Sequence, residues 1–167
     1  MAGEAMARRL RVQGAVELLC AVLLPVVFLR VTGPAAGAVA AWVAVDAALV
    51  VGACYWFARA AKASRGLART PNLRAFASAR VGLIVVLGVT LVVVVADIVT
   101  GGGFAQWFAA AVWLFAVAEY VNYFHLQLSY QNAADLRRLI RRGRLVPAHL
   151  GRELAHPARH AGSLMDT

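Results

Sequence analysis

The sequence predicts an all-α membrane protein, a bundle of four transmembrane helices followed by a basic amphipathic tail in the cytoplasm. The 167-residue chain is 62% hydrophobic and 15% charged, with a mean hydropathy of +0.70. Soluble domains average about 45–50% apolar and about 25% charged residues. Four long apolar runs are bounded by charged residues, Gly or Pro. These observations exclude an ordinary soluble globule and a disordered chain.

Each apolar run is long enough to cross a bilayer. The runs cover residues 12–29, 37–58, 81–99 and 104–128. A membrane-spanning helix needs about 20 mostly apolar residues. No run alternates strictly between apolar and polar residues, so helices are expected rather than barrel strands. We therefore predict a transmembrane domain over residues 1–131 and a cytoplasmic tail over residues 132–167.

The basic residues predict the orientation. The chain has 17 Lys and Arg against 8 Asp and Glu, for a net charge of +9. All of these basic residues except Arg30 lie before the first run, between the second and third runs, or after the fourth. The positive-inside rule then places both termini and the middle loop in the cytoplasm of a multi-pass cell-membrane protein. Because topology alone explains this basic charge, no nucleic-acid partner is expected. Glu17 and Arg30 favour a retained first span over a cleaved signal peptide.

The connections between the spans differ in length. The middle loop, Arg59–Arg80, is expected to carry short helical extensions from both membrane ends, with a break where Pro71 disfavours a helical Thr70. The two outer connections, Val31–Ala36 and Thr100–Gly103, are short. Almost no mass is therefore expected outside the membrane.

The tail is expected to contact the membrane surface. Residues 132–146 combine apolar residues at helical spacing with four arginines that are predicted to contact anionic headgroups of the inner leaflet: Arg137, Arg138, Arg141 and Arg142. Pro147 is predicted to open a second short helix that runs through His149 and Glu153 to about His156.

Neither a metal nor a cofactor is expected. His149, Glu153, His156 and His160 lie together in the tail, but their spacing does not match a zinc site. Cys20 and Cys54 lie within predicted spans, form no C-x-x-C motif, and are interpreted as small packing residues. The sequence also lacks a phosphate-binding loop and a nucleophile elbow.

Each predicted span carries one acidic residue: Glu17, Asp46, Asp97 and Glu119. A carboxylate at the centre of a bilayer costs at least about 2.5–3.5 kcal/mol. From the rise of a helix, Asp46 is expected near mid-membrane and Asp97 near the outer edge, where it faces water or caps the outer turn. Glu17 and Glu119 would lie at one depth and meet if the first and fourth helices pack together.

The fourth span holds the densest polar cluster: Glu119, Asn122, Tyr123 and His125. Two interpretations remain open. In the first, these side chains form a polar pocket in which Glu119 acts as acid or base and His125 relays a proton. In the second, the tyrosine and histidine side chains lie at the membrane interface, and Glu119 and Asn122 join neighbouring helices by hydrogen bonds.

Small residues predict where the helices pack closely. Ala40, Ala44, Ala48 and Gly52 recur every four residues on the second span. Small side chains let helix backbones approach each other. Gly82 and Gly88 are expected to serve as further contact points on the third span.

Three functions remain compatible with these patterns. The leading hypothesis is a small non-enzymatic membrane protein that self-associates or binds a membrane partner. The first alternative is a membrane-embedded enzyme that acts on a lipid or isoprenoid, with Glu119 as acid or base, Glu17 as second carboxylate, and Asn122, Tyr123 and His125 orienting the substrate. The second is a transporter or channel component with Glu17, Asp46 and Glu119 along a proton or cation path.

Overall fold

A computed structural model describes residues 2–125 and 148–155. The chain divides into two compact units, Met1–Tyr120 and Val121–Thr167. The domain boundary predicted after residue 131 and the amphipathic helix predicted over residues 132–146 lie outside the described residues, as do the four arginines of that helix.

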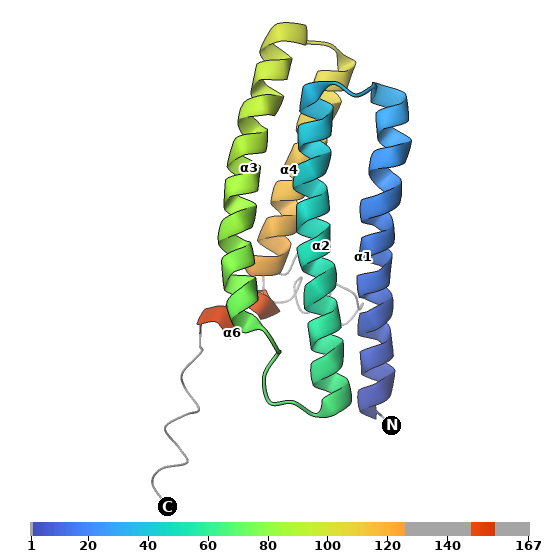
Figure 1. Ribbon diagram of the computed structural model, residues 1–167, viewed down its shortest axis with the longest axis vertical. Helices are drawn as coiled ribbons and strands as arrows, with labels where there is room; N and C mark the ends of the chain where they lie inside the picture. The colour runs from blue at the N-terminus through green and yellow to red at the C-terminus, as the bar shows by residue number, and fades with distance from the viewer. Residues whose placement is uncertain (1, 126–147, 156–167) are drawn as a thin grey trace, which may run out of the picture. The chain divides into compact units, whose positions relative to one another are not determined.

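Four long helices make up the first unit and lie side by side (Figure 1). They are α1 (Ala2–Thr32), α2 (Ala36–Arg65), α3 (Leu73–Gly101) and α4 (Phe104–Phe124), whose last turn enters the second unit. In the part of the chain that the structure describes, all four are long and apolar enough to cross a membrane, and no strand occurs. The predicted all-α bundle of four transmembrane helices is confirmed.

Helices α1 and α2 are longer than the apolar runs inside them. At about 1.5 Å per residue, the 31 residues of α1 span about 46 Å, which exceeds a hydrocarbon core of about 30 Å. The excess lies where α1 begins and α2 ends, which is also where basic residues are concentrated. We call this the basic end of the bundle. The expected extensions of the middle loop are confirmed, because α2 continues to Arg65, α3 begins at Leu73, and Thr70 is not helical.

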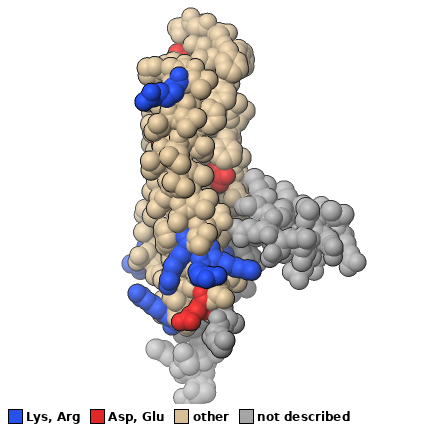
Figure 2. Space-filling model, turned by 90° about the vertical axis from the view of Figure 1, so that its right-hand side faces the viewer, with Lys and Arg blue, Asp and Glu red and all other residues tan. Residues whose placement is uncertain are grey.

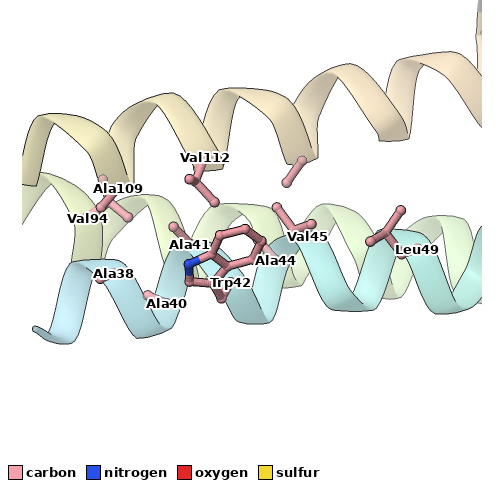
Figure 3. Close-up of a cluster of buried hydrophobic side chains, with 11 residues drawn as sticks. Ala38, Ala40, Ala41, Trp42, Ala44, Val45, Leu49, Val94, Ala109 and Val112 are labelled. Carbon is pink, nitrogen blue, oxygen red and sulfur yellow. The ribbon is translucent and has the colours of Figure 1, made fainter. Parts of the chain in front are cut away.

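The core of the bundle is built on α2. Its predicted small-residue stripe is buried against the rest of the chain, with Ala44 0% and Ala48 1% exposed. Figure 3 shows the buried side chains of α2 around this stripe. They face Val94 of α3 and Ala109 and Val112 of α4. The packing role of the stripe is thus confirmed, and residues of the same chain cover it.

Aromatic rings bring α1 and α4 to the same core. The Phe28 ring of α1 stacks on the Trp42 ring of α2 with centroids 5.4 Å apart. The same Phe28 ring lies 5.4 Å from the Phe108 ring of α4. One side chain of α1 therefore contacts both neighbouring helices near the end of the bundle opposite the basic end.

Hydrogen bonds join α3 to α4. The Trp113 indole N–H donates to the Leu87 carbonyl oxygen at 3.2 Å and to the Thr90 hydroxyl at 3.1 Å. The Thr90 hydroxyl in turn donates to the Val86 carbonyl oxygen at 2.7 Å. These bonds satisfy polar atoms in a region where lipid offers no partner.

The prediction that Gly82 and Gly88 are contact points is wrong within this chain. Both glycines are exposed, and a Cβ atom added to either would meet nothing within 4 Å. They lie on the outward side of α3, together with the exposed Val81, Val85 and Val92. A small residue alone does not reveal which side of its helix faces the bundle.

The second unit contains the end of α4 and α6 (His149–Ala155). The Ala148 N–H donates to the His125 carbonyl oxygen at 3.0 Å, and Leu150 is fully buried. Gly151 approaches the Phe124 carbonyl so closely that a Cβ atom would collide with it. The short helix predicted after Pro147 is thus present, and it begins at His149.

The tight packing of α2 gives a first prediction. Ala44→Leu is expected to destabilise the bundle by about 1–3 kcal/mol, because a buried position with no free volume would have to accept three more carbons. Thermal unfolding in detergent measures the change. Val43→Leu is the control, since Val43 is 51% exposed. Equal melting shifts for the two variants would contradict the assignment of this face to the core.

Candidate functional site

Glu17 is buried between α1 and α2. Its side chain is 8% exposed, and its Oε1 atom accepts a hydrogen bond from the Trp56 indole N–H at 2.7 Å. The bond joins two helices that are long and apolar enough to cross a membrane. This structural use of the carboxyl group was not foreseen from the sequence, which names Glu119 as the neighbour of Glu17. The meeting of these two acids stays a prediction.

Aromatic rings surround this bond at the basic end. The Arg59 guanidinium carbon lies 5.9 Å from the centroids of both the Tyr55 and Trp56 rings. The Tyr55 ring meets the Phe76 ring of α3 edge to face at 5.7 Å. Cation–π contacts of this kind contribute about 0.5–2 kcal/mol. Arg59 is thereby oriented at the end of the α2 span.

Asp97 caps the start of α2. The Gly37 backbone N–H donates to Asp97 Oδ2 at 3.2 Å, and the N-cap residue of α2, Ala35, has no side chain that accepts a hydrogen bond. Asp97 lies near the end of α3, so the cap comes from a neighbouring helix. A carboxylate is favoured here because the first turn of a helix carries a partial positive charge. The sequence left open whether Asp97 faces water or caps the outer turn, and the bond that the structure shows is to the first turn of the neighbouring helix α2.

Asp46 is the carboxyl group whose surroundings do not explain its presence. It lies ten residues after the start of α2, about 15 Å along the helix axis. Its side chain is half-buried, and its Oδ1 atom is shielded from solvent without a hydrogen-bond partner among residues 2–125 and 148–155. Buried polar atoms in proteins are ordinarily satisfied.

The polar cluster of the fourth span falls on both sides of the unit boundary. Glu119 is half-buried in the first unit. Asn122 and Tyr123 lie on the last turn of α4 and His125 follows it, all three in the second unit, with Tyr123 buried and His125 exposed. Both interpretations of this cluster therefore remain predictions.

A neighbouring contact was missed by sequence reasoning. The Arg80 Nε–H donates to the Tyr120 hydroxyl oxygen at 3.4 Å, from the first half of α3 to the buried face of α4. From the sequence, Arg80 is only one of the basic residues that predict the orientation of the spans. The spacing of 40 residues between the partners offers no local pattern that would reveal the pair.

Cys20 and Cys54 have different surroundings. Cys20 packs against the core as predicted, whereas Cys54 is exposed, so its predicted packing role is wrong. Cys54 lies on the outward side of α2. Within the described ranges, no group of three or more His, Cys, Asp or Glu side chains is placed to hold a metal ion. His156 and His160 lie outside those ranges.

Comparison with protein-family models, with curated proteins and with solved structures gives no match for this chain.

The bond between Glu17 and Trp56 gives a second prediction. Glu17→Ala and Trp56→Phe each remove it, so their destabilising effects are expected to overlap by about 0.5–2 kcal/mol in a double-mutant cycle. Glu17→Gln, which keeps an acceptor oxygen, is expected to cost less than Glu17→Ala. Unfolding by SDS measures the wild type, the two single variants of the cycle, their double variant and Glu17→Gln. Strictly additive losses would show that the two side chains do not interact.

The cap on α2 gives a third prediction. In Gly37→Ala, the new Cβ atom would lie 2.5 Å from Asp97 Oδ2 and 2.9 Å from Asp97 Cβ. Asp97 must then move and the cap is lost, so we expect a loss of about 1–2 kcal/mol in thermal unfolding. Gly88→Ala is the matched control and is expected to leave stability unchanged or slightly raised. If Gly37→Ala behaves like Gly88→Ala, the cap contributes nothing.

Proposed function

We propose that this chain is a non-enzymatic, multi-pass membrane protein that works by binding another transmembrane chain, with both of its own termini in the cytoplasm. The observation that carries the proposal is Asp46, a carboxyl group in the middle of a span whose buried oxygen has no hydrogen-bond partner within the described chain.

The other acids of the first three spans support a non-enzymatic role. Glu17 holds α1 to α2, and Asp97 caps α2. Both carboxyl groups thus have structural uses. A proton or cation path through Glu17 would have to break its bond to Trp56, and an enzyme would have to do so to use Glu17 as a second carboxylate.

Asp46 has a different position. Acyl chains offer no hydrogen-bond donor, and a carboxylate at this depth costs at least about 2.5–3.5 kcal/mol. Part of the Asp46 side chain is exposed. A donor at this depth therefore has to come from another membrane-spanning protein segment.

A partner of different sequence fits better than a second copy. About ten residues from the outer ends of α1, α3 and α4, the exposed side chains are Val22, Val92 and Leu114, and none of them donates a hydrogen bond. A second copy would offer these apolar groups or another Asp46. A partner helix with a basic residue in its span would neutralise the carboxylate and satisfy its oxygens.

The basic end supports the proposed orientation. Figure 2 shows most of the Lys and Arg surface of one face near one end of the helices, with a smaller basic patch near the other end. This end carries the start of α1, the end of α2 and the loop before α3. Cytoplasmic flanks are rich in Lys and Arg in multi-pass proteins.

The fourth prediction tests the role of Asp46 directly. In a deletion strain, Asp46→Leu is expected to abolish complementation at normal membrane abundance, whereas Glu119→Gln is expected to retain it. Affinity purification after cross-linking in the membrane is expected to recover a partner at least about tenfold less from Asp46→Leu than from the control Val50→Leu.

The identity of the recovered partner decides the outcome. It must carry a basic residue in a membrane span, and exchanging the two charges, with Lys at position 46 and Asp in the partner, must restore the complex. An unchanged set of cross-linked chains in Asp46→Leu would overturn the proposal. Loss of function in Glu119→Gln at normal abundance would instead favour the enzyme that acts on a lipid.

A further inference from the structure

A pocket lies between the ends of α1 and α2 at the basic end of the bundle. Its volume is about 380 Å³, which is within the range of pockets that hold small ligands. Met6 and Leu10 of α1 form one wall, and Arg59 and Lys62 of α2 form the other. The pocket is separate from Asp46, which lies more than three helical turns from Arg59 along α2.

The charged wall of the pocket suits an anion. Arg59 and Lys62 are three residues apart on α2 and therefore project from the same side of the helix. None of the described residues that line the pocket is acidic. Contacts with the Tyr55 and Trp56 rings restrain Arg59, so less conformational entropy is lost when its guanidinium group binds a ligand. Two cations at one wall are typical of a phosphate site.

The remainder of the pocket suits an apolar chain. Met6 is 53% exposed and Leu67 is 40% exposed, although both are large apolar side chains beyond the predicted spans. Leu67 reaches the pocket because α2 ends in a left-handed turn at Gly66, where φ is 63°. The backbone N–H groups of Gly66 and Leu67 both donate to the Lys62 carbonyl oxygen, and they fix this turn.

The pocket lies just beyond the apolar runs of α1 and α2. Met6 and Leu10 precede the apolar run that begins at Val12, and Arg59 and Lys62 follow the run that ends at Ala58. The pocket thus lies at the level of the lipid headgroups when the two apolar runs occupy the hydrocarbon core. Phosphate groups of phospholipids lie at this level, with acyl chains directly beneath them.

From these observations we infer that the pocket binds one anionic phospholipid. Arg59 and Lys62 hold its headgroup phosphate, and Met6, Leu10 and Leu67 contact the glycerol and the first part of the acyl chains. Basic pockets at the cytoplasmic ends of transmembrane helices recognise acidic headgroups by this combination of charge and apolar contact. The site does not depend on Asp46 or on a protein partner.

The fifth prediction is made with the purified full-length protein in a neutral detergent. Phosphatidylglycerol is titrated against the wild type, and binding is followed by native mass spectrometry and by the rise in melting temperature over each variant's own lipid-free value. Arg59→Gln/Lys62→Gln is expected to weaken binding about thirtyfold, since each basic residue near a membrane surface contributes about a factor of five. Arg65→Gln/Arg69→Gln removes the same charge at the same end without lining the pocket, and is expected to weaken binding less than threefold.

One further variant and one further lipid make each outcome decisive. Met6→Trp narrows the pocket without changing charge and is expected to weaken binding at least about tenfold, so it tests the site even if the double variant unfolds. Phosphatidylcholine, which has no net charge, is expected to bind far more weakly than phosphatidylglycerol. Equal loss in both double variants, or full binding by Met6→Trp, would overturn the proposal. Stabilisation by inorganic phosphate to the same extent as by the lipid would show a site for free phosphate instead.

Discussion

The close approach of helices to α2 is the constraint on which the rest of the structure depends. In a bilayer, lipid tails are as apolar as the side chains that they contact, so burial of apolar surface gives little drive for helices to associate. Contact between well-fitted surfaces has to supply that drive. The small residues Ala40, Ala44, Ala48 and Gly52 let α2 bring its backbone close to its neighbours, and larger side chains such as Trp42 and Phe28 then fill the remaining space.

Polar side chains inside the spans follow from the same packing. Once two helices lie close together, a donor on one can reach an acceptor on the other, as Trp56 reaches Glu17 and Trp113 reaches the backbone of α3. At the end of the bundle opposite the basic end, the start of α2 lies close enough to α3 for Asp97 to cap it. These bonds lock the rotation and register of each helix pair. Asp46 departs from this rule, because its buried oxygen has no hydrogen-bond partner among the described residues, and we propose that a partner chain supplies one.

The sequence predicted the properties that depend on summed composition. The number of spans, the helical extensions, the break at Thr70 and the short helix after Pro147 all follow from local residue preferences and span length. The partner of each polar side chain could not be predicted, because Glu17 with Trp56 and Arg80 with Tyr120 depend on the register between helices. Gly82 and Cys54 were misjudged for a related reason, since composition does not fix which side of a helix faces inward.

The antiparallel register of α1 against α2 is nearly constant along their length. Phe28 meets Trp42 near one end, Glu17 meets Trp56 farther along, and Leu10 packs near Ala60 at the other. The two helices therefore form one continuous seam that crosses all depths of the membrane. In mid-membrane, only another protein segment offers a complement to an unsatisfied carboxyl group. At the headgroup level, phospholipids offer anionic phosphate to Arg59 and Lys62. The depth of a polar group along these helices thus selects the kind of partner that we assign to it.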